Sequence, residues 1–443
     1  MIALLKNLAP ILLYLGFIFT AIASLTGNVR LGLFFLTALL PLQNVIQKLQ
    51  DFPLGKDFND ILLFCMVFGW FISKASKGGR LLAKTSFTGI LFLYLIFTYI
   101  TLWMGSQFLH DGPPINPADP RVQNWKNYMV LPLLFFITMN NIRDVKDMRN
   151  MMVVMCASMF LMNYYNVQQV ADMTSWQNRT KVHGTFVDLG ANEVASFYAT
   201  YTFVLIGLLF YIKEKKEKLG LMALIGTNFF IVLFMFSRAA YMATAAAFIF
   251  ISFMKNKALL IIPLVLALFW TTLLPKDVIT RVTFSEHEGE LDDSAATRLV
   301  LWQQSIAYFQ ESPIIGIGFN VFSKIGLRKD AHNVFMRTLA EQGMVGFLFL
   351  ITIMLLALSS SWRLYRRARD PFLKGFGLGF CACVIANMIS NFFGDRWTPM
   401  CLAGYYWIFL GMAERGNMIV NEQSAPVQKK VKTETPKRER YRR

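Results

Sequence analysis

The chain has 443 residues, of which 55% are hydrophobic and only 16% are charged, and its mean hydropathy is +0.44. Because soluble domains carry about 25% charged residues, this composition excludes an ordinary soluble domain and predicts an all-α polytopic membrane protein. The net charge of +17 comes from short basic loops and a basic C-terminal end. This distribution argues against a nucleic-acid partner and is typical of segments that orient a membrane protein.

Apolar runs that approach the length needed to cross about 30 Å of hydrocarbon recur along the whole chain. If 8–26 and 30–48 both cross the membrane, the count is thirteen spans and the N-terminus lies outside. If one of them is re-entrant or interfacial, the count is twelve and both ends lie in the cytoplasm. The runs make residues 1–413 a single transmembrane domain. They cover residues 8–26, 30–48, 59–73, 87–105, 127–140, 151–169, 191–212, 219–236, 239–254, 258–274, 334–360, 375–393 and 397–413.

Strongly basic loops alternate with the other connections between these runs. The positive-inside rule places the basic loops in the cytoplasm and the other connections in the periplasm of a bacterial cell. Residues 414–443 are also basic and lack hydrophobic periodicity, so they are expected to form a disordered cytoplasmic tail. The basic loops are 74–84, 141–149, 213–218, 255–257 and 362–369, and the outer segments are 106–126, 170–190, 275–333 and 394–399.

The outer segment 275–333 is far longer than an ordinary helix connection, and loops of this length are usually functional or disordered. Within residues 298–310, apolar side chains at Leu299, Trp302, Ile306 and Phe309 have the spacing of an amphipathic helix. We therefore expect a long, ordered periplasmic loop that contains amphipathic helices and lies on the membrane surface as a lid.

All four histidines fall in predicted outer segments, and histidine is the side chain best suited to proton transfer near neutral pH. His332 stands at the end of the long loop, directly before an apolar helix. It is either an interfacial residue beside a helix cap formed by Asp330 or Asn333, or the group that performs chemistry. Ionisable residues at membrane depth favour the second interpretation.

Two of those ionisable residues follow His332. Asn333, Arg337 and Glu341 are spaced i, i+4 and i+8, so they share one face of the expected helix. Arg337 and Glu341 can pair, which lowers the cost of placing both in the membrane.

Several basic and polar side chains are candidates for binding an anion. Arg238 lies at the outer end of an expected helical hairpin, and Arg298 begins the amphipathic helix one turn before Trp302. A guanidinium stays charged and binds phosphate oxygens bidentately, although a snorkelling or solvated arginine is the alternative at each position.

Polar residues also gather in the outer segment 170–190 and at the helix start that follows it. Arg179 and His183 precede a glycine-containing turn, and Asn192 either binds substrate or caps a helix. No cluster of histidine or acidic residues near the membrane surface has the spacing of a metal site. A mechanism without metal or cofactor is therefore favoured.

The ordered set of motifs resembles the O-antigen ligase and O-antigen polymerase superfamily. The likeness covers roughly residues 175–350. The motifs that carry it are Gly184-Thr185-Phe186, Ala191-Asn192, Ser237-Arg238, Arg298-x-x-x-Trp302, Ser312-Pro313-x-x-Gly316-x-Gly318, His332-Asn333 and Glu341-x-Gly343-x-x-Gly346.

The resemblance implies an inverting, metal-independent glycosyltransferase of the bacterial inner membrane. Such enzymes take a glycan from an undecaprenyl-diphosphate carrier at the periplasmic face and attach it to an acceptor hydroxyl, and membrane lipid surrounds the site. His332 would match the catalytic histidine, and Arg238 and Arg298 would match the arginines that bind the diphosphate. Arg281 is a nearby competitor for Arg298.

The acceptor separates the branches of the superfamily. A ligase uses a lipid A-core sugar or a protein hydroxyl, whereas a polymerase uses another lipid-linked repeat unit. The His332-Asn333 element and the arginine pair favour the ligase branch. The alternative from another class is a transporter or flippase for lipid-linked glycans. Such a protein would carry charged residues through both leaflets, whereas the polar candidates here gather in the outer segments.

Overall fold

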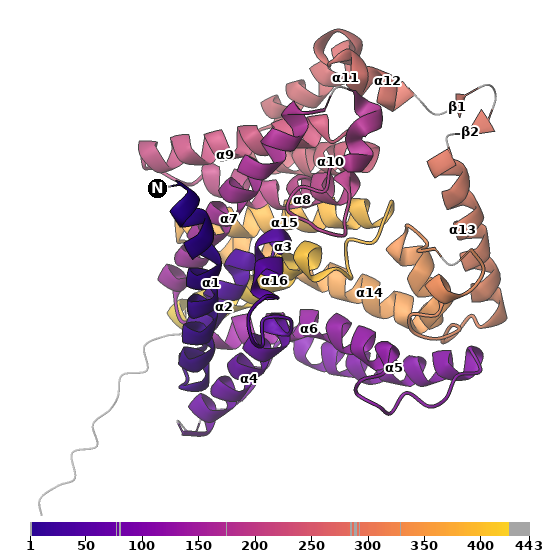
Figure 1. The fold of residues 1–443 in the computed structure, drawn as a ribbon. Coiled ribbons are helices and arrows are strands. Elements are labelled where there is room, and N and C mark those ends of the chain that lie inside the picture. Colours follow the sequence, from indigo (N-terminus) through magenta and orange to yellow (C-terminus); the bar gives the residue numbers. More distant parts are fainter. Residues whose placement is uncertain are drawn as a thin grey trace, which may run out of the picture.

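The computed structural model describes residues 2–76, 78, 81–173, 175–283, 286–287, 290–291, 293–327 and 329–424. The predicted all-α fold is confirmed, with one short antiparallel pairing of β1 (Glu286–His287) and β2 (Glu290–Leu291). Most of the helices pack together in one bundle (Figure 1). The helices of the described residues are α1 (Ile2–Leu25), α2 (Val29–Leu39), α3 (Gln43–Ile46), α4 (Phe58–Ser76), α5 (Ser86–Phe108), α6 (Pro120–Asn141), α7 (Val145–Ala171), α8 (Ala191–Leu209), α9 (Lys215–Phe234), α10 (Arg238–Lys255), α11 (Ile261–Leu273), α12 (Lys276–Thr283), α13 (Asp293–Glu311), α14 (Val334–Arg367), α15 (Pro371–Asn391) and α16 (Met400–Ser424), with 3₁₀ helices η1 (Gln47–Leu49), η2 (Trp176–Lys181), η3 (Lys257–Leu260) and η4 (Phe322–Lys324).

The chain is a multi-pass membrane protein, but the predicted twelve or thirteen spans are not confirmed. Across the described ranges, six helices are long and apolar enough to cross a membrane, namely α1, α4, α5, α9, α14 and α15. The number rises to eight if each of two bent pairs is one span: α2 with α3 and η1, bent by 110°, and η3 and α11 with α12, bent by 106°. A helix also lies at each of the other predicted spans. Two of these, α8 and α16, are buried over most of their length, so other helices rather than lipid surround them.

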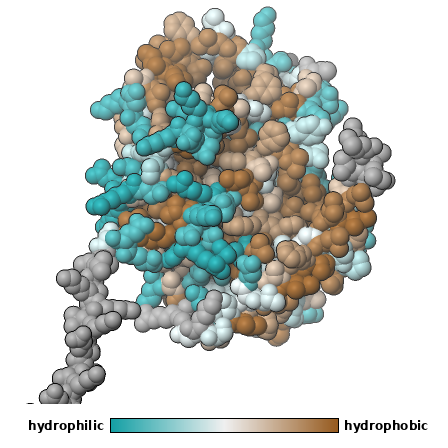
Figure 2. Space-filling view, turned by 90° about the vertical axis from the view of Figure 1, so that its left-hand side faces the viewer, coloured by the Kyte–Doolittle hydropathy of each residue, from teal (hydrophilic) through white to brown (hydrophobic). Residues whose placement is uncertain are grey.

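Hydrophobic side chains cover broad areas of the outer surface beside clusters of hydrophilic ones (Figure 2). Phe64 on α4 and Phe160 on α7 are 67% and 71% exposed. Large exposed aromatic side chains on long helices are expected where lipid rather than water surrounds the protein.

The basic loops lie together at one end of the bundle. Arg149 Nη2 lies 3.4 Å from Asp370 Oδ2, and Arg415 Nη2 donates to the carbonyl oxygen of Arg143 at 2.7 Å. Lys255 Nζ lies 4.0 Å from the centre of the Tyr211 ring. These contacts join segments far apart in sequence, as the positive-inside pattern requires.

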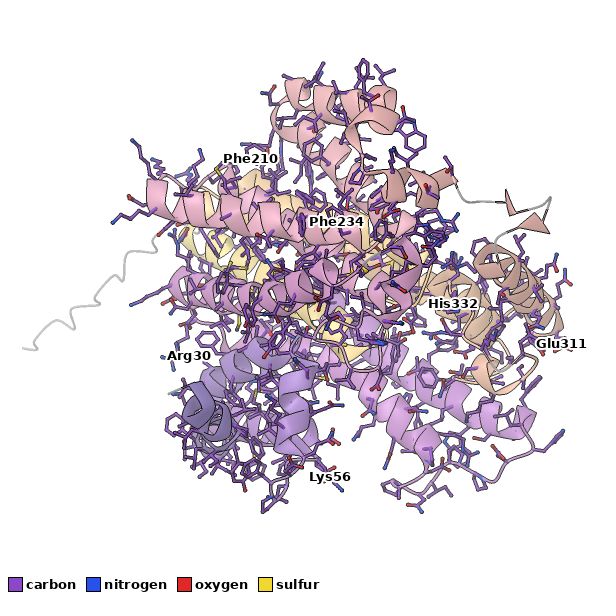
Figure 3. The ribbon with its side chains drawn as sticks, turned by 45° about the horizontal axis from the view of Figure 1, so that its top comes forward. Arg30, Lys56, Phe210, Phe234, Glu311 and His332 are labelled. Carbon is purple, nitrogen blue, oxygen red and sulfur yellow. The ribbon has the colours of Figure 1, made fainter. Side chains whose placement is uncertain are left out.

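The predicted outer segments gather at the opposite end. Phe319 N donates to Thr101 O at 3.0 Å, and the Arg281 guanidinium lies 5.3 Å from the centre of the Trp176 ring. His332 lies on the far side of the molecule from Arg30 and Phe210, which adjoin the basic loops (Figure 3). The predicted alternation of basic and outer segments therefore matches the fold.

The predicted boundary of the tail at residue 414 is wrong. Helix α16 continues to Ser424, and Glu414 is 5% exposed. The Ser360 hydroxyl donates to the Glu414 carboxylate, which also lies 3.6 Å from Arg363 Nη2. These partners on α14 stabilise the buried carboxylate, so the helix extends beyond the apolar run. The remaining tail, residues 425–443, lies outside the described residues.

The long outer segment contains the expected helix, which begins at Asp293 rather than at Arg298. On α13, Leu301 and Ser305 are buried and Tyr308 packs against Phe322, with ring centres 6.1 Å apart. Leu299 and Ile306, two of the apolar residues at helical spacing, are 46% and 45% exposed. Apolar residues run unbroken from 299 to 302, so periodicity alone does not show which stripe contacts protein.

The glycine-rich segment 312–322 is inserted into a break in α14. At Gly343 the backbone has φ 60° and ψ −162°, which interrupts the helix. The free backbone groups then bond to the inserted segment: Ile317 N to Ala340 O (2.9 Å), Gly318 N to Glu341 O (2.8 Å), Met344 N to Pro313 O (2.9 Å) and Val345 N to Ile314 O (3.1 Å). Two motifs distant in sequence thus form one backbone junction beneath the loop that carries His332.

Replacing Gly318 with alanine should destabilise this junction. Gly318 has a φ of +122°, and an added Cβ would lie 2.1 Å from the Gly105 Cα on α5. A side chain in left-handed backbone costs about 1–2 kcal/mol, and the backbone clash adds to that cost. We expect a lower midpoint of thermal unfolding in detergent. Gly112→Ala is the control, because a Cβ there meets nothing within 4 Å. Equal midpoints for the two variants would contradict this account.

Candidate functional site

Five arginines line one cavity of about 320 Å³. They come from five separate elements: Arg179 from η2, Arg238 from the first residue of α10, Arg281 from α12, Arg298 from α13 and Arg396 from the turn between α15 and α16. Within the part of the chain that the structure describes, no acidic side chain lines this cavity. So many fixed positive charges around one space suit a ligand with several negative charges.

A second cavity of about 420 Å³ contains His332 and adjoins the first. The two cavities share the lining residues Asn192, Arg298, Phe393 and Arg396. The shared side chains form the wall between them. The arginine cavity and the histidine cavity are therefore two halves of one site.

His332 has an unusual backbone conformation and a shifted pKa. Its φ is +50°, which is uncommon for a residue other than glycine, and its backbone N donates to Asp330 Oδ2 at 3.0 Å. Partial burial lowers the pKa of the imidazole, the Asp330 carboxylate opposes this shift, and the Arg298 and Arg396 guanidiniums lower it further. The ring, about half exposed, is therefore neutral at pH 7 and able to accept a proton.

Arg396 is a member of the site that the sequence interpretation missed. It lies in the outer turn 394–399 and is 6% exposed. Its Nη1 lies 2.8 Å from Glu193 Oε1, and its backbone N donates to Asn391 Oδ1 at 3.0 Å. An arginine in a short outer turn between two apolar helices was the available signal, the same signal that identified Arg238.

Arg337 forms ion pairs and a hydrogen bond with two segments that carry residues of the site. Its Nη1 lies 2.6 Å from Asp395 Oδ2 and 3.4 Å from Asp330 Oδ1, and its Nη2 donates to Thr398 Oγ1 at 2.7 Å. The predicted pairing with Glu341 is present at 4.0 Å, but Asp395 is the closer partner. Arg337 therefore connects the loop that carries His332 with the turn that carries Arg396.

Asp395 is held as a carboxylate by this network. Burial alone would raise its pKa, but the Arg337 guanidinium and hydrogen bonds from Thr398 and Trp397 hold the pKa below its ordinary value. The ionised group keeps the ion pair with Arg337 at neutral pH, so the turn stays in place.

Two other predicted residues, Asn192 and Trp302, also lie in the arginine cavity. Arg179 Nη1 donates to Asn192 Oδ1 at 3.1 Å, so Asn192 orients an arginine of the site. Trp302 lies one turn after Arg298 on α13 and lines the same cavity.

Three predicted site residues line neither cavity. His183 is exposed, with Nδ1 3.1 Å from the carbonyl oxygen of Leu189. Asn333 caps α14, because its Oδ1 accepts from Phe335 N at 2.9 Å and from Met336 N at 3.2 Å. Glu341 is buried and accepts from Phe322 N at 3.0 Å, so it anchors the inserted segment.

The donor set of the site suits an oxyanion rather than a metal cation. Guanidiniums supply hydrogen-bond donors and positive charge, which repel a metal ion and bind phosphate. In the described ranges, no three or more His, Cys, Asp or Glu residues are grouped so that they could hold a metal ion. The site can therefore bind a phosphate-containing ligand beside a neutral imidazole.

Several of the site residues lie in a region that matches a known protein family. Residues 221–351 match the family model described as O-Antigen ligase, and no curated protein matches the chain. The match spans Arg238, Arg281, Arg298 and His332, and the resemblance inferred from the motifs is confirmed.

Proposed function

We propose that this chain, a membrane protein of the O-antigen ligase superfamily with the family domain at residues 221–351, transfers a glycan from an undecaprenyl-diphosphate-linked donor to an acceptor hydroxyl. The family supports membrane glycosyltransferase activity of the ligase or polymerase type. The observation that carries the finer proposal is the convergence of five arginines beside a neutral His332.

The diphosphate of the donor binds in the arginine cavity. Arg238 and Arg298 were expected to bind it, and Arg179, Arg281 and Arg396 line the same space. Guanidiniums aimed at the diphosphate stabilise the negative charge that builds on it as the glycosyl bond breaks. Diphosphate is already a good leaving group, so the arginines could promote its departure without a metal.

The acceptor hydroxyl enters on the His332 side. The neutral imidazole takes the hydroxyl proton while the hydroxyl oxygen attacks the anomeric carbon. The bond between that carbon and the diphosphate oxygen breaks, and its electron pair leaves with the diphosphate. Attack from the face opposite the leaving group inverts the anomeric configuration.

The lipid tail of the bound donor extends out of the site between α10 and α13. Met242 and Leu299 line the arginine cavity, and they are also 52% and 46% exposed. Apolar side chains at the mouth of a charged cavity suit a ligand with a diphosphate joined to a hydrocarbon chain. Helix α13 thus acts as the lid that admits the donor sideways from the bilayer.

The site faces the periplasm of a bacterial inner membrane, and the end of α16 lies in the cytoplasm. Support comes from the basic loops, which contact one another at the end of the bundle opposite His332 (Figure 3). The positive-inside rule assigns that end to the cytoplasm.

The acceptor that we propose is a lipid A-core sugar, as in the ligase branch. Purified protein should be given a lipid-linked glycan donor with each acceptor separately, in the presence and absence of a chelator. Transfer to core oligosaccharide supports a ligase, transfer to protein a protein ligase, and extension of the donor a polymerase. Loss of activity with the chelator would contradict the metal-free mechanism, and absence of any product would favour a transporter.

The pH dependence of transfer should report on His332. Because its pKa lies below the ordinary value of about 6.5, kcat/KM should fall only as the pH drops below that value, when the ring takes up a proton. Asp330→Asn should move the acidic limb to still lower pH, since the carboxylate favours the imidazolium. An acidic limb above pH 6.5 for the unmodified protein would contradict the assignment.

A further inference from the structure

A third cavity, of about 530 Å³, lies at the end of the bundle away from His332. Its walls come from the first turns of α7 and α9, the end of α8 and the start of α15. Arg149 and Lys213 in its lining belong to the basic loops, and neighbouring Phe210 lies on the opposite side of the molecule from His332 (Figure 3). This cavity is therefore separate from the candidate glycosyltransferase site.

The interior of this cavity is apolar and opens toward the outer surface. Met152, Val153 and Cys156 on α7 face Leu221 and Leu224 on α9. Val153 is 66% exposed, so one wall of the cavity is also part of the hydrophobic surface. A hydrocarbon chain entering from the bilayer would replace lipid contacts with protein contacts of the same kind.

The rim of the cavity carries charges of both signs. Arg149 and Lys213 supply two positive charges, and Glu214 and Glu217 supply two negative ones. Arg149 Nη2 lies 3.4 Å from Asp370 Oδ2, and this ion pair is exposed to the surroundings of the protein. Exposed ion pairs contribute little to stability. The four charged side chains that line the cavity include two of each sign, so charge complementarity favours a ligand that carries one group of each sign.

We infer that this cavity binds a glycerophospholipid whose head group has a phosphodiester and a primary ammonium. The phosphate lies between Arg149 and Lys213, the ammonium donates to Glu214 and Glu217, and an acyl chain fills the apolar interior. A lipid with phosphate alone leaves the two carboxylates without a partner. A quaternary ammonium has no N–H to donate.

Binding at this position would join four helices at the end of the bundle opposite the candidate site. Two of them reach that site: α8 begins beside Asn192, and α15 ends just before Phe393. The bound lipid would therefore hold the helices on which the site is built, whatever reaction the site performs.

Two glycines on α9 offer a matched test of the cavity. An added Cβ meets nothing within 4 Å at Gly220 or at Gly226, but only Gly220 lines the cavity. Delipidated protein in detergent should unfold at a temperature about 2 °C or more higher when phosphatidylethanolamine is added. Gly226→Phe should keep this shift and Gly220→Phe should lose it. A shift that persists in Gly220→Phe would overturn the location.

The head group is tested by comparing lipids on the unmodified protein. Phosphatidylethanolamine should raise the unfolding midpoint more than phosphatidylcholine or phosphatidylglycerol does. The double variant Glu214→Gln, Glu217→Gln should lose this preference. An equal or larger shift with phosphatidylglycerol would overturn the assignment of a zwitterionic lipid. Because the readout is lipid-dependent stability, it does not depend on the proposed transferase activity.

Discussion

Replacing His332 with alanine should lower the rate of glycan transfer by about 10²- to 10⁴-fold, the usual contribution of a general base. Binding of the lipid-linked donor should change little, because the arginines of the adjoining cavity remain in place. The measurement is the initial rate at saturating donor, with donor affinity determined separately. Near-normal transfer by His332→Ala would remove this residue from the mechanism.

His110 provides a control for the backbone effect of that substitution. It has a φ of +54°, close to the +50° of His332, and it is also exposed in an outer segment. It lines neither half of the site. His110→Ala therefore makes the same chemical change in the same backbone region, and its transfer rate should equal that of the unmodified protein. A similar loss in both variants would show a structural rather than a chemical effect.

Replacing Arg298 with alanine should lower kcat by roughly 10²- to 10³-fold, as expected when one donor to a developing oxyanion is removed. Arg298 lines both halves of the site, so the loss should include weaker donor binding. Arg298→Lys should be intermediate, because lysine keeps the charge but not the bidentate geometry. Steady-state kinetics with varied donor concentration separates the two effects.

The pH profile gives Arg298→Ala a second readout. The Arg298 guanidinium lowers the pKa of His332, so its removal should move the acidic limb to higher pH, and Arg298→Lys should not. Arg121→Ala is the control. Arg121 lies at the same end of the bundle with its Nη2 2.5 Å from Asp119 Oδ2, and it lines neither cavity. An unshifted limb in Arg298→Ala would contradict the closeness of the two groups.

Much of the candidate site was predictable because its residues mark places where a polar chain meets apolar runs. Arg238 is the first residue of α10, His332 lies two residues before α14, and Arg298 lies in the second turn of α13. All three are on the outer side, where an ionisable residue near lipid indicates a functional site. The order of the motifs then indicated the family. Arg396 stands in a similar place, but it belongs to no motif that was recognised, so only its position beside Glu193 and His332 identifies it.

Sequence spacing left open the partners of two other candidates. Asn333 was a candidate for a helix cap as well as for substrate binding, and its side chain caps α14. Glu341 was a candidate for substrate binding. Its carboxylate accepts a hydrogen bond from Phe322 N of the inserted segment 312–322. In each case the partner is a backbone N–H. The N–H groups that Asn333 accepts from are local, two and three residues further on, whereas the packing of the inserted segment brings the Phe322 N–H to Glu341.

The sequence by itself determined that the chain is an α-helical membrane protein, which of its loops share a side, and which family its central motifs resemble. Hydropathy and charge act locally, since each apolar run or basic loop responds to lipid or to the membrane interface on its own. Only the tertiary structure decided that five arginines from five elements surround one cavity beside His332. That convergence depends on helix packing between residues more than 200 positions apart, such as Arg179 and Arg396, and no local pattern records it.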